Sequence, residues 1–216
     1  MKGLTPEVLN LVLDYEEKKS EIRKRLEEFK EVWKQPDKQI FSELCFCLCT
    51  PQAKAIYCGR AISSLEKKEV LFKGNASQIR KGLNAIRFPN NKTRYIMEAR
   101  KLFTVNGIIR IKNKIDENNI FETRQWFVRN VKGFGFKEAS HFLRNIGFGD
   151  DFAILDVHIL RSMMRYGIID KQPKTITKNQ YLCLENELRQ FSQKANVPMD
   201  EIDLLFWASE TGKIFK

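Results

Sequence analysis

The segment Val131-Lys132-Gly133-Phe134-Gly135-Phe136-Lys137 constrains the fold of this chain more than any other. Apolar side chains recur at helical spacing before and after it, and Gly133 and Gly135 interrupt that spacing. Glycine can take a positive φ and lets another backbone approach closely. We therefore expect two short helices joined by a tight hairpin between Phe127 and Ile146. Backbone amides at such a hairpin, close to a helix N-terminus, can bind a phosphate without reading a base sequence.

Two reactive side chains accompany this hairpin. Lys137 is expected in the first turn of the second hairpin helix, where its amine can act as a nucleophile. Asp156 follows 19 residues later, between apolar residues and directly before a helix-like pattern that begins at Val157. This position makes Asp156 a candidate N-cap. The hairpin, the lysine and the aspartate form a constellation and not a single motif.

The charge of the chain favours a polyanionic partner, either nucleic acid or an anionic membrane surface. Its 216 residues hold 38 Lys and Arg against 27 Asp and Glu, a net charge of +11. No apolar run approaches the roughly 20 residues that span a bilayer, and the N-terminus has no signal-peptide core. We therefore expect a soluble, intracellular protein, large enough for one domain or for two small lobes that share a cleft.

Helical spacing recurs along the chain, and no convincing alternating strand pattern interrupts it, so the fold is expected to be all-α. Thr50-Pro51-Gln52 is expected to open a helix, and Asn106-Gly107 to form a turn. In a helix from Asn90 to Lys101, Lys92 is expected on the outward face. Cysteines at alternating positions in an apolar segment, Cys45, Cys47 and Cys49, match neither a disulfide framework nor a zinc site. They are expected to be buried thiols, and the sequence shows no metal-ligand cluster.

The hairpin, Lys137 and the triplet Asp156-Val157-His158 resemble the helix-hairpin-helix superfamily of base-excision DNA glycosylases, in its lysine-bearing, bifunctional branch. The segments Cys49 to Ala55 and Ile86 to Lys92, the short length and a chain ending in lysine are most similar to the archaeal-type 8-oxoguanine DNA glycosylase/AP lyase family. Together the matching segments span about residues 40 to 216.

This resemblance implies two helical lobes with the active site in the cleft between them. Residues 1–50 with 148–216 would form one lobe, and residues 51–147 a central lobe that ends in the helix-hairpin-helix at 127–146. The cleft would hold Lys137 and Asp156.

The resemblance also implies the chemistry. A damaged base, 8-oxoguanine, would be rotated out of duplex DNA. Lys137 would attack the sugar C1′ and form a Schiff base, Asp156 would stabilise the developing positive charge, and β-elimination would cleave the strand. The expected partner is double-stranded DNA containing a damaged base, with no membrane partner, and the protein is expected to act as a monomer in the cytoplasm or nucleoid.

Further site residues follow from the resemblance, each with an ordinary structural alternative. Trp207 and Lys216 would help to form the base pocket, although Trp207 lies in an apolar run typical of a core. Phe88 would stack on the extruded base, or would be a core phenylalanine. Gln52 would be a wedge that fills the gap left by the base, or merely the second residue of a helix capped by threonine. His158 would contact a phosphate, or be a capping-turn or core histidine.

Gly133 and Gly135 would contact the DNA backbone. Related endonuclease-type glycosylases hold an iron-sulfur cluster on four cysteines after the catalytic aspartate, but only Cys183 follows Asp156 here, so such a cluster is excluded. No other cofactor is expected, although hairpins of this type can hold a monovalent cation through backbone carbonyls.

Two other functions are compatible with the same residues. Helix-hairpin-helix units also serve as passive DNA-binding modules, in which Lys137 would be a phosphate contact and Asp156 an ordinary N-cap. Within the enzyme class, the lesion could instead be another damaged base, such as an oxidised or mismatched pyrimidine.

Overall fold

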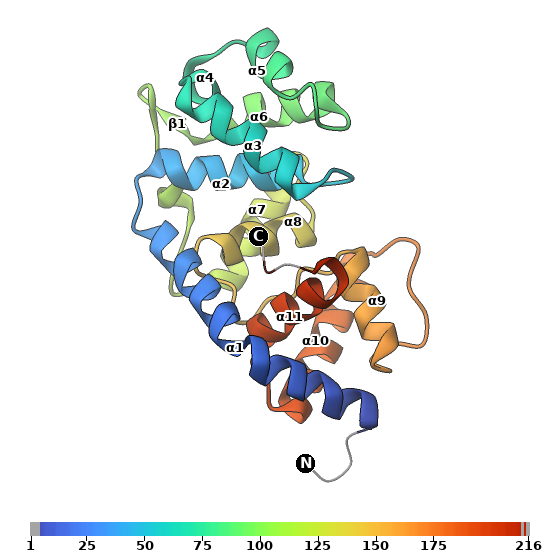
Figure 1. The fold of residues 1–216 in the computed structure, drawn as a ribbon. Helices are drawn as coiled ribbons and strands as arrows, with labels where there is room; N and C mark the ends of the chain where they lie inside the picture. The colour runs from blue at the N-terminus through green and yellow to red at the C-terminus, as the bar shows by residue number, and fades with distance from the viewer. Residues whose placement is uncertain (1–4, 213, 215–216) are drawn as a thin grey trace. The chain divides into compact units, whose positions relative to one another are not determined.

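The computed structural model describes residues 5–212 and residue 214, and it confirms the predicted all-α fold (Figure 1). The helices are α1 (Pro6–Trp33), α2 (Asp37–Cys49), α3 (Ala55–Lys67), α4 (Val70–Lys73), α5 (Ala76–Gly82), α6 (Pro89–Phe103), α7 (Ile120–Asn130), α8 (Phe136–Asn145), α9 (Val157–Arg165), α10 (Lys178–Ala195) and α11 (Met199–Thr211), with a 3₁₀ helix η1 (Ile111–Lys114) before α7.

A small β-hairpin follows α6. Its strands β1 (Thr104–Val105) and β2 (Ile108–Ile109) are antiparallel, with Thr104 opposite Ile109. Asn106 and Gly107 have φ values of 50° and 77°, as a two-residue hairpin turn requires. The predicted turn is confirmed, whereas strands of two residues are too short to show an alternating pattern in the sequence.

The chain forms two compact units. Unit 1 consists of Met1–Lys30 and Gly147–Lys216, and unit 2 of Glu31–Ile146. Unlike the predicted lobes, these units place residues 31–50 with the central segment. The physical reason is that α2 packs against α3, α6 and α8, all of which belong to unit 2.

The core of unit 2 is built around α2 and the two hairpin helices. Every residue of α2 from Leu44 to Cys49 is buried, and none of the described cysteines forms a disulfide. Burial raises the pKa of the Cys49 thiol to about 12, so this thiol is neutral. Phe127 of α7 joins the hairpin to this core, with its ring centroid 5.0 Å from that of Phe142 and 5.9 Å from that of Phe103.

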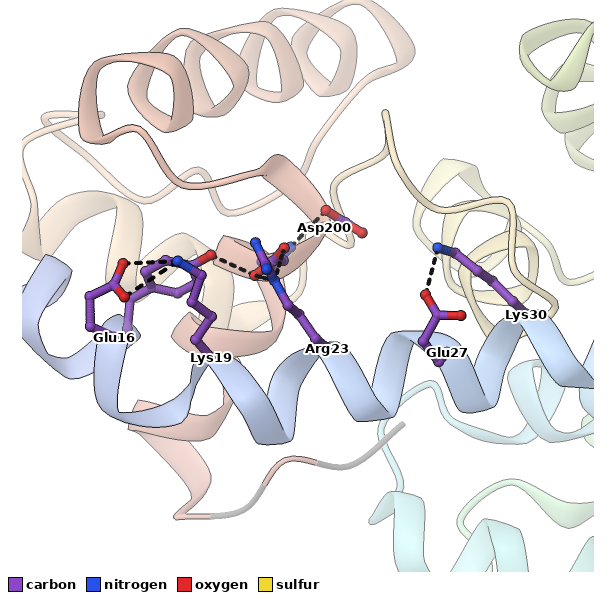
Figure 2. A network of polar contacts seen from close by, with 8 residues as sticks. Glu16, Lys19, Arg23, Glu27, Lys30 and Asp200 are labelled. Atoms are coloured by element: carbon purple, nitrogen blue, oxygen red, sulfur yellow. Dashed lines mark hydrogen bonds and ion pairs between the residues drawn. The ribbon is translucent and has the colours of Figure 1, made fainter.

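The core of unit 1 lies between one face of α1 and the C-terminal helices. Figure 1 shows α9, α10 and α11 grouped together, and α11 packs against both other helices. On α1, Tyr15 is buried and its hydroxyl donates to Glu201 Oε2 at 2.6 Å, while Arg23 Nε lies 3.1 Å from Glu201 Oε1. Figure 2 shows Arg23 of this network on α1, together with the exposed pair Glu27 and Lys30. One face of α1 is therefore buried, and the rest of the helix is solvated.

Asp200, in the first turn of α11, titrates abnormally. Burial, reinforced by the negative charge of Asp150, raises its pKa from an ordinary value near 3.8 to about 6. Because the folded-state pKa lies above the unfolded value, the native state binds the proton more tightly. The resulting stabilisation is present below about pH 4 and is lost as the pH rises through about 6.

Replacing Asp200 by Asn should therefore stabilise the protein at neutral pH. We expect Asp200→Asn to raise the free energy of unfolding by about 1 to 2 kcal/mol at pH 7.5 and to have little effect at pH 4. Urea unfolding at both pH values measures the difference, with Asp170→Asn in an exposed loop as the control. An equal change at both pH values would contradict the assigned titration.

Candidate active site

The predicted helix-hairpin-helix is present in unit 2. Helix α7 ends at Asn130, and the chain then turns through Gly133, which has a φ of +92°, before α8 begins at Phe136. The amide of Phe134 donates to the carbonyl of Val131 at 3.1 Å and closes the turn. A Cβ added at Gly133 would lie only 2.6 Å from the ring of Tyr95. Glycine is required at this position both by the backbone conformation and by the adjacent ring.

Glu138 links the hairpin to Lys137. Its Oε2 accepts a hydrogen bond of 3.0 Å from the amide of Gly135, and its Oε1 lies 3.6 Å from Lys137 Nζ. The carboxylate thus caps the start of α8 and pairs with the neighbouring ammonium group. Of the hairpin amides expected to face outward, that of Gly135 therefore has an internal acceptor.

Lys137 occupies the first turn of α8, as predicted, and its side chain is only 22% exposed. Its positive charge contributes to a lowered pKa of Lys92, although desolvation of Lys92 is the larger cause. Burial raises the pKa of the Cys58 thiol, and the charges of Lys92 and Lys137 oppose that rise. Lys137 therefore shares its surroundings with a second lysine and a buried thiol.

The prediction that Lys92 faces outward is wrong, because its side chain is only 3% exposed. Lys92 Nζ donates to the carbonyl of Cys49 at 2.6 Å and to that of Pro51 at 3.0 Å. These two carbonyls belong to the end of α2 and to the turn that follows it. Nothing in the sequence indicated that Lys92 would be buried against these carbonyls, because a lysine on a helix usually extends its charged end into solvent.

Gln52 lies in the turn that Lys92 contacts. The expected helix does not begin at Thr50, whose hydroxyl instead donates to the carbonyl of Cys47 at 2.9 Å, but at Ala55. The alternative that Gln52 is the second residue of a threonine-capped helix is therefore wrong. Gln52 is exposed and has a φ of 54°, in the left-handed region that non-glycine residues rarely adopt.

Phe88 has the same unusual backbone conformation, with a φ of 57° at the N-cap position of α6. Its side chain is 47% exposed, so the alternative of a core phenylalanine is wrong. The guanidinium group of Arg87 lies 4.8 Å from the ring centroid. The ring is therefore partly exposed, and its role in stacking stays a prediction.

Asp156 belongs to unit 1 and is the N-cap of α9, as predicted. Its Oδ1 accepts hydrogen bonds from the amides of His158 at 2.8 Å and Ile159 at 2.9 Å. Among the described contacts, Asp156 Oδ2 has no partner. One carboxylate oxygen therefore fixes the helix start, and the other is available for chemistry.

The segment that leads to Asp156 is extended and buried, and side chains from α10 and α11 satisfy its backbone. The amide of Ala153 donates to Glu185 Oε1 and that of Ile154 to Asp203 Oδ1, each at 3.0 Å. The Tyr181 hydroxyl donates to the carbonyl of Ala153 at 2.6 Å. The sequence reasoning missed Glu185 and Asp203, although an aspartate within the apolar run of the last helix was a usable signal.

The remaining predicted residues of unit 1 are only partly informative. His158 lies in the first turn of α9, and its ring Nδ1 is buried with no hydrogen-bond partner in the described part of the chain. Trp207 lies on α11 and is half-buried, so it is not a fully enclosed core residue. Lys216 lies outside the described residues.

Unit 2 therefore contains Lys137, Gly133, Gly135, Gln52 and Phe88, whereas Asp156, His158 and Trp207 belong to unit 1. Their meeting in one cleft stays a prediction. Over residues 5–212 and 214, no group of three or more His, Cys, Asp or Glu side chains could hold a metal ion. The same residues include no helix with the length and apolar character needed to cross a membrane.

Comparison with known proteins agrees with this geometry. A family model described as 8-oxoguanine DNA glycosylase, of helix-hairpin-helix type, matches residues 22–197. The 8-oxoguanine DNA glycosylase/AP lyase of Fusobacterium nucleatum is 44% identical over 204 residues, which cover 94% of each chain. That of Methanocaldococcus jannaschii is 37% identical over 210 residues, or 92% of this chain and 95% of the relative. The chain therefore belongs to the 8-oxoguanine DNA glycosylase family.

Solved structures show the same fold. The crystal structure of the Methanocaldococcus jannaschii 8-oxoguanine DNA glycosylase matches with a TM-score of 0.85 and 34% identity, covering 97% of this chain and 95% of that one. A second structure of the enzyme from that organism, in complex with a 15mer DNA containing 8-oxoguanine, also matches with a TM-score of 0.85, at 35% identity and 95% and 99% coverage.

The hairpin geometry predicts unequal costs for two glycine substitutions. Gly133→Ala should lower the free energy of unfolding by about 2 to 4 kcal/mol, because it adds both backbone strain and a clash with Tyr95. Gly107→Ala is the matched control, since Gly107 also has a positive φ but no atom within 4 Å of an added Cβ, and should cost only about 1 kcal/mol. Denaturant unfolding of both variants measures the difference, and equal costs would show that Tyr95 does not limit the hairpin.

Proposed function

We propose that this protein is a bifunctional DNA glycosylase and AP lyase that removes 8-oxoguanine from duplex DNA. The observation that carries the proposal is the position of Lys137, which lies largely buried in the first turn of α8 directly after the Gly133 turn. The chain also belongs to a family in which the Methanocaldococcus jannaschii relative has been crystallised with DNA containing 8-oxoguanine.

Duplex DNA would be bound through its backbone. The net charge of +11 attracts a polyanion, and the backbone of the hairpin would approach a phosphate. The damaged nucleotide would then rotate out of the stack at a cost of a few kcal/mol. Gln52 would fill the vacated space, and His158 would contact a phosphate near the rotated nucleotide. The exposure of Gln52 supports the first of these roles.

The chemistry would be carried by Lys137 and Asp156. The neutral amine of Lys137 would attack C1′ of the nucleotide, the bond from C1′ to the base would break, and the base would leave with a proton. Opening of the sugar ring gives a Schiff base between C1′ and Nζ. Loss of a proton from C2′ then breaks the C3′–O3′ bond, and water releases the lysine. Asp156 Oδ2, which has no described partner, would stabilise the positive charge that develops on the sugar.

The base pocket would include Trp207, Lys216 and Phe88. The exposed ring of Phe88 and the partial exposure of Trp207 support stacking against a planar base. A monovalent cation bound by hairpin carbonyls would strengthen the contact with a phosphate. The protein would act on nucleoid DNA as a monomer without another cofactor.

Replacing Lys137 by Gln tests the proposal directly. On a labelled duplex with one 8-oxoguanine opposite cytosine, the wild type should give a covalent adduct with borohydride and Lys137→Gln should give none, because the amine is lost. DNA binding should change by less than about fivefold, since the hairpin remains. An adduct with the variant would exclude Lys137 as the nucleophile. If the wild type gives no adduct on either this duplex or an abasic-site duplex, a passive DNA-binding module is favoured. If the wild type is trapped on the abasic-site duplex alone, the protein removes a different lesion.

Asp156→Asn should separate chemistry from folding. The asparagine oxygen can still accept the two amide hydrogen bonds at the start of α9, so we expect thermal melts to differ by no more than a few degrees. The single-turnover rate of base release should fall by at least about a hundredfold, because the negative charge is lost. Asp156→Ala is the control that also removes the cap, and should lose a further ~1 kcal/mol of stability. A wild-type rate in Asp156→Asn would restrict Asp156 to capping.

A further inference from the structure

Lys92 is a charged side chain enclosed in the core of unit 2. It is 3% exposed, and its described side-chain contacts are the carbonyls of Cys49 and Pro51, at 2.6 and 3.0 Å. None of these contacts is a carboxylate that would balance its charge. Enclosing an ammonium group in this way costs free energy, so a lysine used only to fill space would be a poor choice.

The backbone that Lys92 contacts is strained. Gln52 and Phe88 are both exposed and both in the left-handed conformation, which costs about 1 kcal/mol or more for a residue with a Cβ. Asn106 and Asn196 share this conformation, but asparagine tolerates it. Glu69 also adopts it, and its carboxylate pairs with a lysine at 2.9 Å. Neither Gln52 nor Phe88 is an asparagine, and the described side-chain contact of Phe88 is with the adjacent guanidinium group of Arg87.

Lys92 is joined to both strained segments. Its backbone amide donates to the carbonyl of Phe88 at 3.2 Å in the first turn of α6. Its ammonium group holds the carbonyls of Cys49 and Pro51, directly before Gln52. Lys137 lies near enough for its charge to act on Lys92. One residue therefore spans from the Phe88 segment to the Gln52 turn beside the proposed nucleophile.

We propose that Lys92 is a positioning residue that holds the Gln52 turn against the Phe88 segment, so that both exposed side chains are preorganised to meet DNA. This inference rests on the proposed glycosylase function. Preorganisation lowers the ordering cost at binding, and a site held by a second layer of contacts keeps its reactive geometry. The two hydrogen bonds to carbonyls keep the ammonium group engaged, which separates Lys92 from the nucleophilic role of Lys137.

Arg100 provides a matched control on the same helix. Its guanidinium group also donates to two backbone carbonyls, those of Leu71 at 3.3 Å and Gly74 at 2.7 Å. Desolvation lowers the pKa of Arg100, as it does for Lys92. Arg100 thus represents the general structural value of a partly enclosed cation on α6 without a link to Gln52 or Phe88.

The experiment is a double-mutant cycle on single-turnover release of 8-oxoguanine, measured well below the melting temperature of each variant. Lys92→Met and Gln52→Ala should each slow base release by about tenfold, and the double variant should be no slower than the slower single variant. Arg100→Met should stay within about threefold of the wild-type rate even at an equal loss of melting temperature. Hydrogen exchange at the Ala53 amide, which closes the turn on the carbonyl of Thr50, should accelerate in Lys92→Met and not in Arg100→Met.

The positioning role would be overturned if the rate loss of the double variant equalled the product of the two single losses. It would also be overturned if Arg100→Met slowed base release as much as Lys92→Met does. If Lys92→Met does not fold, Lys92→Gln, which keeps one amide donor, replaces it in the same cycle. The proposed function fails separately, through an adduct that persists in Lys137→Gln or through a wild type that releases no base. If the wild type forms the borohydride adduct but the rate losses of the Lys92 and Gln52 variants multiply, only the role of Lys92 is rejected.

Discussion

Where the chain leaves a helix inside the core, its backbone amides and carbonyls must still find hydrogen-bond partners, and both units depend on this constraint. In unit 1, two amides of the extended segment before Asp156 donate hydrogen bonds to the carboxylates of Glu185 and Asp203. In unit 2, the turn after α2 offers its carbonyls to Lys92. The carboxylates accept hydrogen bonds from backbone amides, and the ammonium group donates hydrogen bonds to backbone carbonyls. The sign of the charge on each buried side chain therefore matches the backbone group to which it is hydrogen-bonded. The first of these segments leads directly to Asp156 and the second to Gln52, both of which are proposed site residues.

The local features of the fold were predictable, because contacts within one or two turns determine them. The positive φ at Gly133, the N-cap at Asp156 and the Asn106-Gly107 turn each depend on residues at most a few positions apart, whereas the close approach of Tyr95 to Gly133 does not. The apolar character of α2 likewise predicts its burial, since a helix that is apolar all round has no face for solvent. These features fix the helix-hairpin-helix, the start of α9 and the interior position of α2.

The buried charges were not predictable, because their partners are distant in the chain. Lys92 lies 43 residues from Cys49, and Asp203 lies 49 residues from Ile154. A lysine in an amphipathic helix is normally exposed, so the pattern around Lys92 predicted the outward face. The helix start expected at Thr50 failed for a related reason. Its hydroxyl donates backward to α2, and the strained turn that follows is stabilised by a residue that local patterns cannot connect to it.

The N-terminus of α8 in unit 2 and that of α9 in unit 1 use electrostatics in opposite senses. Asp156 places a carboxylate at the start of α9, where the helix dipole stabilises an anion. Lys137 places an ammonium group at the start of α8, where the same dipole opposes a cation, and the Glu138 carboxylate 3.6 Å away offsets part of that cost. Unit 2 thus departs from local stability rules at Lys137, Gln52 and Phe88. A folded chain retains such departures where function requires them, because each costs stability that a more ordinary residue would restore.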